Sequence, residues 1–391
     1  MNWLTVESDK FYTLGIYHNN EYNKCIEKNW EVIIGKIKNH LNSILKRKLS
    51  LHQRVIYANS CLLSKVWYIV HTYPLNKTYA KEINKLVFQY VWGGRYEPIK
   101  RNTICRPKKE GGLGMINCLA KANTIMINTF LKSYTYEEYR NVLMYHYCFI
   151  RLSNILPSNF SIHHASPWTP VYYDIAITEM RGIIHLSRFP NAPKRKIYMS
   201  MLPKEQSLAE HLYPTLNWNN IWDNFNVLPM FSYDKEILYK HLHMVLATNK
   251  RLFSMNLSNT DKCNRCTTDR EQTPLHLFYE CDLVKPLFMW LLKILYYVSN
   301  YTPISNIKVI YLDNKYSTIE QKKICNLFIS IYILTVWRNR KENLRIGIMK
   351  RRVISKVIQT INTVKQMQNI SREKNIGNCL DRIDLMDLIT K

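Results

Sequence analysis

The chain has 391 residues, and its 55 Lys and Arg side chains against 29 Asp and Glu give a formal net charge of +26 at pH 7. Hydrophobic residues make up 47% of it, which excludes a disordered or collagen-like protein and favours a globular one with about two to four domains. Such an excess of positive charge favours a polyanionic partner, nucleic acid or a membrane surface. The longest apolar stretch, residues 327–337, is too short to span a bilayer, and residues 1–11 lack the apolar core of a signal peptide. We therefore expect an intracellular protein of a reducing compartment, nuclear or cytoplasmic, without a membrane partner.

The first part of the chain is predicted to form a bundle of three helices. Apolar residues recur there at offsets of three and four, the spacing of one buried helix face. They do so over residues 26–45, 55–70 and 83–91. Gly93 and Gly94 follow the third stretch and are typical of a left-handed helix stop. Helices in sequence with short connections favour a small bundle.

A basic surface is predicted on this bundle, because no acidic residue occurs between Val32 and Lys81. A solvated helix face normally mixes both signs, since opposite charges four residues apart stabilise each other. Segregated positive charge is typical of a surface that faces phosphates. The alternative is that some of these lysines only keep the bundle soluble. The candidate nucleic-acid contacts here are Lys36, Lys38, Lys46, Arg47, Lys48 and Arg54.

A glycine-rich joint, Gly111-Gly112-Leu113-Gly114, follows a second group of basic residues. It lacks the Lys-Ser/Thr ending of a nucleotide-phosphate loop, so its glycines need only backbone freedom before the next helix. Eight of the chain's 14 prolines then lie between Arg151 and Ser232, which indicates a connecting region with short helices. The basic residues at the joint that we expect to contact nucleic acid are Lys100, Arg101, Lys108 and Lys109.

Helical periodicity returns after the connecting region, with apolar residues at helical spacing over 324–337 and 353–364. No acidic residue occurs between Asn343 and Arg372, which predicts a second basic surface on a helical tail. A membrane-surface role for this tail is the alternative, and its Thr, Gln and Asn content disfavours it. The candidate nucleic-acid contacts of the tail are Lys350, Arg351 and Arg352.

A metal site is predicted from Cys263, Cys266, His276 and Cys281. Thiolates and imidazole are the ligands that zinc prefers, and a Cys-x2-Cys turn aims two sulfurs at one point. With four protein ligands the site is closed, so we expect a structural Zn²⁺ and not a catalytic one. The spacing of five between His276 and Cys281 does not suit one face of a regular helix, so a helix must break or end at the metal. The alternative is that these residues coincide in a cysteine-containing core.

The sequence shows no readable active site, and we expect no catalytic residues. It contains no His-Glu-x-x-His, Gly-x-Ser-x-Gly or Gly-x-Gly-x-x-Gly motif and no Asp-Asp pair. Two-metal phosphoryl transfer needs clustered carboxylates, and the aspartates here are scattered. Enzymatic activity of this chain on its own is therefore not expected.

Taken in order, these segments resemble the C-terminal part of the reverse transcriptases of non-LTR (LINE-type) retrotransposons. Phe11-Tyr12-Thr13-Leu14-Gly15-Ile16 looks like the primer-grip hairpin that follows the palm, and residues 49–55 look like the start of the thumb helix. Residues 88–92, 99–101 and 106–114, in that order, resemble the segment that ends the thumb. The tract from Trp222 to Trp290, with its Cys/Cys/His/Cys set, is similar to the zinc-binding region found downstream.

The resemblance implies a mainly α fold with a three-helix thumb-like bundle, a helical proline-containing linker, a small CCHC zinc knuckle region and a helical C-terminal tail. The expected segments are 1–20, a remnant of the palm and primer-grip hairpin; 21–135, the bundle; 136–232, the linker; 233–295, the zinc-binding region; and 296–391, the basic helical C-terminal region. It also implies that Leu14 and Gly15 lie by the primer end.

In function, the resemblance implies binding of RNA, DNA or an RNA–DNA hybrid, with the thumb holding the template–primer duplex and the zinc region helping to bind RNA and target DNA. The family's palm and catalytic aspartates are absent from this sequence, so only binding roles carry over. The expected partner is a catalytic reverse transcriptase or an upstream domain outside this chain. An adopted host protein that binds RNA, or a scaffold that meets partners through its zinc region, is the open alternative.

Overall fold

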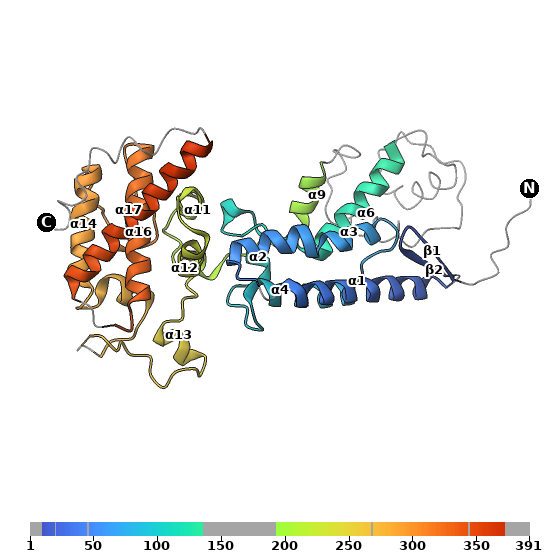
Figure 1. Ribbon diagram of the computed structural model, residues 1–391, viewed down its shortest axis with the longest axis horizontal. Helices are drawn as coiled ribbons and strands as arrows, with labels where there is room; N and C mark the ends of the chain where they lie inside the picture. Colours follow the sequence, from blue (N-terminus) through green and yellow to red (C-terminus); the bar gives the residue numbers. More distant parts are fainter. Residues whose placement is uncertain are drawn as a thin grey trace, which may run out of the picture. The chain divides into compact units, whose positions relative to one another are not determined.

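The computed structural model describes residues 10–19, 21–44, 47–135, 193–266, 269–342 and 345–371, and these residues are mainly helical (Figure 1). The mainly α fold expected from the sequence is therefore confirmed. Lys46 and most of the predicted linker, residues 136–192, lie outside the described residues. Among the described helices, none has both the length and the apolar character needed to cross a membrane.

The chain divides into two compact units. The first comprises Met1–Leu49, Gln53–Arg106 and Leu113–Glu205, and the second comprises Ser50–His52, Pro107–Gly112 and Gln206–Lys391. Two short segments from the front of the chain therefore belong with its C-terminal half. The five-segment division drawn from the sequence stays a prediction.

The first unit begins with a hairpin of β1 (Lys10–Thr13) and β2 (Ile16–Asn19), paired antiparallel. Leu14 and Gly15 join the strands with φ angles of 51° and 79°. Positive φ at both turn residues matches the right-handed twist of the strands, which is why such turns favour glycine. The Asn29 side chain ties β2 to the following helix, because its Oδ1 accepts from the Tyr17 N–H at 2.9 Å and its Nδ2 donates to the Tyr17 carbonyl at 2.8 Å.

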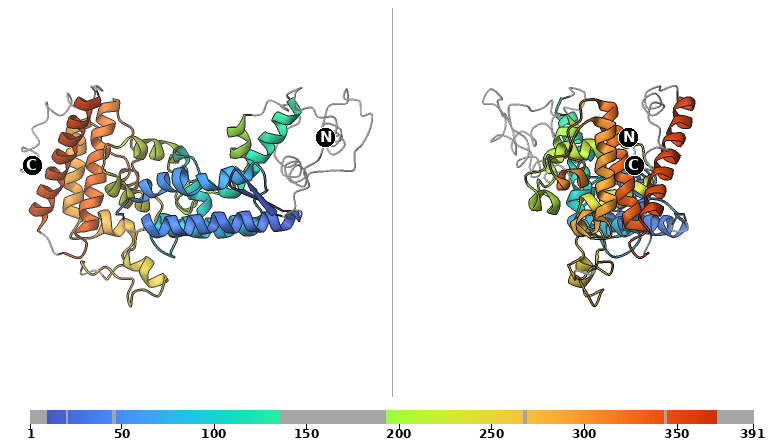
Figure 2. Two further views of the ribbon diagram at one scale, coloured as in Figure 1. Left: turned by 45° about the vertical axis from the view of Figure 1, so that its right-hand side comes forward. Right: turned by 90° about the vertical axis from the view of Figure 1, so that its left-hand side faces the viewer.

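The helices described in the first unit pack around one apolar core. They are α1 (Tyr22–Ile44), α2 (Leu51–Tyr57), the π turn η1 (Ala58–Leu62), α3 (Ser64–Val70), α4 (Lys77–Trp92), α5 (Arg101–Cys105), α6 (Cys118–Thr135) and α9 (Lys194–Met201). α1 packs against α3 and α4, which both contact α6 (Figure 2). The apolar stripe of α1 is buried, with Trp30 and Ile37 fully enclosed. This burial is the main source of stability, at about 25 cal/mol per Å² of apolar surface.

Two local features shape these helices. The helix expected over 55–70 is widened at η1, and Asn59 on this turn donates to the Gly114 carbonyl at 2.9 Å and accepts from the Ile116 N–H at 2.9 Å. The widened turn thus satisfies backbone groups of a distant segment. α4 ends at Gly93 in the left-handed region, as the sequence predicted, with φ of 70°. A side chain there would also meet Arg54, whose Nη1 lies 2.6 Å from the position of a Cβ.

The second unit is built around α16 (Ile319–Arg338). Every residue of α16 from Ile324 to Trp337 is buried, so the helix needs neighbours on all sides. α12, α14 and α17 provide them, and α14, α16 and α17 run side by side (Figure 1). The helices described here are η2 (Lys108–Glu110), α10 (Leu208–Leu212), α11 (Trp218–Val227), α12 (Ser232–Leu242), α13 (Asn249–Ser254), the π turn η5 (His276–Glu280), α14 (Lys285–Ser299), α15 (Asn306–Ile310), α16 and α17 (Ile346–Ser371).

A buried carboxylate joins three of these helices. Asp234 of α12, which is 5% exposed, accepts from Arg338 of α16 at 2.5 Å and lies 3.6 Å from the Lys356 Nζ of α17. A buried charge is tolerated only when it is paired, so this cluster fixes how α12, α16 and α17 sit together.

The first glycine of the glycine-rich joint lies beneath aromatic rings. The Gly111 carbonyl accepts hydrogen bonds from the Tyr239 hydroxyl and from His243 Nε2, both at 2.9 Å. The Trp222 ring stacks on His243 with centroids 4.8 Å apart and covers the glycine. Gly111 has φ of +78°, and a Cβ there would lie 2.5 Å from Trp222 Cε2. The position therefore needs glycine for its backbone and for the space.

We expect Gly111→Ala to lower the unfolding free energy of the second unit by about 2–4 kcal/mol, because alanine adds left-handed strain and a clash with the Trp222 ring. Denaturant unfolding followed by tryptophan fluorescence measures this loss. Gly35→Ala in α1 is the control, since a Cβ meets nothing within 4 Å there and a helix gains up to about 1 kcal/mol from the change. Equal midpoints for Gly111→Ala and the unaltered protein would contradict the role given to Gly111.

Protonation of a buried histidine is expected to weaken the fold in acid. His241 is fully buried between Phe278 and Tyr311, and its Nε2 lies 3.2 Å from the Ile310 carbonyl. Burial lowers the pKa of His241 to about 4, so between pH 6.5 and 4 the unfolded chain binds a proton that the folded chain does not. Stability should therefore fall across this window, by about 3 kcal/mol in total from this residue. His241→Phe should reduce that slope in unfolding experiments from pH 7 to 4, and parallel slopes for both proteins would refute it.

Candidate metal centre and basic surfaces

The four predicted metal ligands lie together in the second unit. Cys263, Cys266, His276 and Cys281 each offer one ligand atom, and these atoms lie within 4.8 Å of one another. The Cys266 Sγ is 3.4 Å from His276 Nε2. Tetrahedral zinc, with Zn–S of about 2.3 Å and Zn–N of about 2.0 Å, sets a sulfur and a nitrogen about 3.5 Å apart. The cluster could therefore hold a metal ion.

A short ribbon positions the first of these ligands. Lys262 and Glu271 form an antiparallel bridge, and the Cys263 N–H donates to the Arg270 carbonyl at 2.8 Å. The Gln272 N–H donates to the Asp261 carbonyl at 2.8 Å, which closes the ribbon. Cys263 lies on this ribbon and Cys266 follows three residues later. The hydrogen bonds of the ribbon therefore hold the backbone from which the Cys-x2-Cys segment starts.

A π turn positions the other two ligands. η5 runs from His276 to Glu280, and the Cys281 N–H donates to the His276 carbonyl at 2.8 Å, a bond across five residues. Cys281 itself is extended, with φ of −63° and ψ of 129°. The hydrogen bonds of a π turn span five residues where those of an α-helix span four, so the turn is wider and residues five apart lie closer to the same side. The helix ends at the cluster, as the spacing of five predicted.

The environment of the cluster favours a thiolate at Cys263. A hydrogen bond from Cys281, aided by the backbone N–H groups of Arg265 and Cys266, lowers the pKa of Cys263. The same hydrogen bond, together with burial, raises the pKa of Cys281. A deprotonated sulfur that accepts backbone N–H groups is the form in which cysteine binds metals.

The cluster is attached to the core through α16 and the residues after it. Arg265, in the Cys-x2-Cys turn, donates to the Asn339 carbonyl and to the Glu342 carbonyl, the latter at 2.6 Å. The Tyr332 hydroxyl of α16 donates to the Phe278 carbonyl in the π turn at 2.5 Å. The geometry of the metal ligands thus depends on the main helix of the unit.

We expect Cys266→Ser to lose most metal affinity and to lower the unfolding temperature by at least about 5 °C, because the fourth strong ligand is gone and metal binding contributes to folding. Cys266 is the suitable position, since it is only partly buried and its replacement leaves the core packing intact. Metal analysis and thermal unfolding, with and without a chelator, measure both effects. Cys61→Ser, a partly buried cysteine outside the cluster, is the control. Equal metal content in Cys266→Ser and Cys61→Ser would contradict the assignment of Cys266 as a metal ligand.

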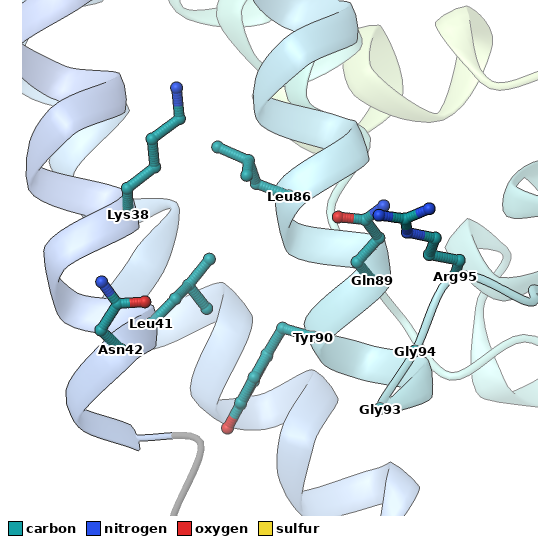
Figure 3. Close-up of a pocket in the computed structure, with 9 residues that line it drawn as sticks. All are labelled: Lys38, Leu41, Asn42, Leu86, Gln89, Tyr90, Gly93, Gly94 and Arg95. Atoms are coloured by element: carbon teal, nitrogen blue, oxygen red, sulfur yellow. The ribbon is translucent and has the colours of Figure 1, made fainter.

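A groove in the first unit lies between α1 and α4 (Figure 3). Its volume is about 300 Å³, and its lining residues are Lys38, Leu41, Asn42, Leu86, Gln89, Tyr90, Gly93, Gly94 and Arg95. Lys38 stands on one side, on α1, while Gln89 and Arg95 lie close together on the other (Figure 3). The groove is therefore polar and positively charged at its rim, with an apolar floor.

Further positive charge lies around the Tyr90 end of this groove. Burial raises the pKa of Tyr90, the Tyr57 ring 5.9 Å away acts in the same direction, and Arg54 and Arg47 oppose them. These two arginines are therefore close enough to act on the phenol. The Arg54 guanidinium also packs against Gly93 of the groove. The sequence had selected Lys38, Arg47 and Arg54 but not Arg95, whose only sequence signal is its place directly after the glycine stop.

The remaining candidate nucleic-acid contacts of the first unit differ in their exposure to solvent and in their pairing. Lys36 and Lys48 are exposed. Lys100 is exposed and lies 3.9 Å from Glu205. Arg101 is bound by Glu97 through two hydrogen bonds, of 2.7 and 2.5 Å, and lies 5.0 Å from the centroid of the Phe88 ring. Arg101 is thus fixed within the protein.

The second unit holds the other candidates. Lys108 and Lys109 on η2 and Arg351 on α17 are exposed. Lys350 lies 5.5 Å from the centroid of the Trp290 ring, and Arg352 pairs with Glu342 at 3.3 Å.

The predicted primer-grip residues form the exposed tip of the hairpin. Leu14 is 85% exposed, and its carbonyl accepts from the Tyr68 hydroxyl of α3 at 2.9 Å. The rings of Tyr12 and Tyr68 are 64% and 50% exposed. The sequence did not single out these tyrosines, because their gathering around Leu14 depends on the docking of the hairpin.

No protein-family model and no curated protein matches this chain. Its function therefore has to be inferred from its own residues. What the described residues bring together is a cluster in the second unit that could hold a metal ion, and in the first unit a positively charged groove and an exposed aromatic tip.

Proposed function

We propose that this protein binds a nucleic-acid duplex through its first unit, in the manner of the thumb of a non-LTR retrotransposon reverse transcriptase. The observation that carries this proposal is the groove between α1 and α4, with Lys38 on one rim and Arg95 on the other. A duplex clamp has to neutralise phosphates without reading sequence, and cations on both sides of a groove suit that task.

The charges around the groove support a phosphate as the partner. Lys38 has one carboxylate near it, Glu82 at 3.0 Å, and both side chains are about half exposed. An exposed pair of this kind contributes at most about 1 kcal/mol, so a phosphate can compete for the lysine. Arg47 and Arg54 add positive charge at the other end of the groove.

The hairpin tip supports a second contact with the same duplex. Tyr12, Leu14 and Tyr68 expose flat or apolar groups there, and bases stack on such groups. The hairpin packs against the start of α1, where the Asn19 N–H contacts Cys25, and the groove includes Lys38 of the same helix. The rise of α1 between these points is roughly 20 Å. A duplex advances that far in about six base pairs, so one duplex can meet both.

Zinc is the metal that we propose for the Cys263, Cys266, His276 and Cys281 cluster. Three sulfurs and one imidazole in a tetrahedral set suit zinc, and four protein ligands leave no open position for a substrate. The ion would be structural, holding the π turn and the Cys-x2-Cys turn together. By the resemblance, this region would help to bind RNA and target DNA in the nucleus or the cytoplasm.

We expect the purified full chain to bind an RNA–DNA hybrid with a steep dependence on salt, more tightly than single-stranded RNA. Duplex DNA is the third ligand in the series. Lys38→Gln combined with Arg95→Gln should weaken binding to the hybrid by about 10-fold per lost contact near 0.1 M salt and should reduce the slope of log K against log salt by about two units.

Lys194→Gln combined with Lys196→Gln is the matched control, because it removes the same charge from exposed positions of α9. If the two double variants show the same affinity and slope, net charge alone explains the binding and the groove has no special role. If the unaltered protein binds none of the three nucleic acids, the proposed function is wrong.

A further inference from the structure

Three basic side chains from separate parts of the sequence meet in the second unit. They are His52 at the start of α2, Lys108 on η2 and Lys235 on α12. The Lys108 Nζ lies 3.5 Å from His52 Nε2, which can accept a hydrogen bond from it. The charges that act on His52 are those of Lys108 and Lys235, and the charge that acts on Lys235 is that of Lys108. These charges all have the same sign.

Burial and this repulsion both disfavour the charged forms. They lower the pKa of His52, and they lower the pKa of Lys235 to about 8. At neutral pH Lys235 still carries its charge. An arrangement of like charges that is partly withdrawn from water is relieved when an anion enters it.

The cluster is held in place by neutral groups. The Lys235 Nζ donates to the Asn226 carbonyl at 3.1 Å, and the Asn226 side chain donates to the Lys108 carbonyl at 2.9 Å. Asn226 thus binds the side-chain ammonium group of Lys235 and the backbone carbonyl of Lys108. The neighbouring carboxylate of Glu236 accepts from the Leu51 N–H at 2.9 Å and from Lys240 at 2.8 Å.

We propose that His52, Lys108 and Lys235 form an anion site that takes a phosphate group. Ammonium groups offer only donors, the His52 imidazole offers a ring N–H, and phosphate oxygens are strong acceptors. None of these three residues lines the groove. The phosphate is either part of a nucleic-acid backbone, a choice that rests on the function proposed above, or a free phosphate.

The test uses the full chain and inorganic phosphate, with chloride of equal ionic strength as the reference. Phosphate should raise the unfolding temperature of the unaltered protein, and His52→Gln and Lys235→Gln should each lose that rise. Lys235→Gln should be at least as stable as the unaltered protein in chloride, because it removes repulsion between like charges, and this separates loss of the site from misfolding. Lys240→Gln, a change of equal charge on the same helix, should keep the response to phosphate.

Binding of the RNA–DNA hybrid then identifies the source of the phosphate. A loss of about 10-fold in affinity and about one unit of salt slope in Lys235→Gln supports a backbone phosphate. Loss of the phosphate response with unchanged hybrid binding, or with no hybrid binding by any form of the protein, supports a site for free phosphate. A phosphate response that is absent from the unaltered protein, or that persists in both variants, overturns the proposal whatever the hybrid experiment shows.

Discussion

α16 (Ile319–Arg338) has to be covered on every side, because its residues from Ile324 to Trp337 are all buried. The rest of the second unit follows from that requirement. The helices that cover α16 bring Asp234 to Arg338, and the end of α16 supplies the Asn339 carbonyl that receives the Cys-x2-Cys turn. The four candidate metal ligands are too few to form a hydrophobic core of their own. Their positions are therefore held by contacts with a helix that apolar burial has already fixed.

The excess of positive charge is distributed in two ways. Some cations are held by carboxylates of the same unit at 2.5 Å, as Arg101 is by Glu97 and Arg338 is by Asp234. Others, such as Arg95, stand at the rim of the groove. The first kind stabilises the fold locally, whereas the second raises the potential that draws a polyanion toward the protein. Sequence composition does not separate the two, since both count equally in the net charge of +26.

Local signals predicted much of the fold. Periodicity located α1, α4, α16 and α17 but not α14, Gly93 ended α4 as expected, and the cysteine and histidine spacing selected four side chains that do lie together. The features that the sequence did not predict depend on contacts between residues far apart in the chain. Asn59 on the π turn η1 hydrogen-bonds to the Gly114 carbonyl. The hydrogen bonds to the Gly111 carbonyl come from rings more than a hundred residues away in the chain. Arg95, His52 and Lys235 carry no local pattern, because what distinguishes them is the neighbours that the fold supplies.

The π turn at the metal ligands also limits how the chain can change in length. His276 and Cys281 share one side only because five residues complete the turn between them. An insertion or deletion of one residue there would turn one ligand away from the other three. Burial restricts substitution of Leu277 and Phe278, but only a change in the number of residues moves a ligand. A spacing of five between a histidine and a cysteine would thus persist among distant relatives after most other similarity had been lost.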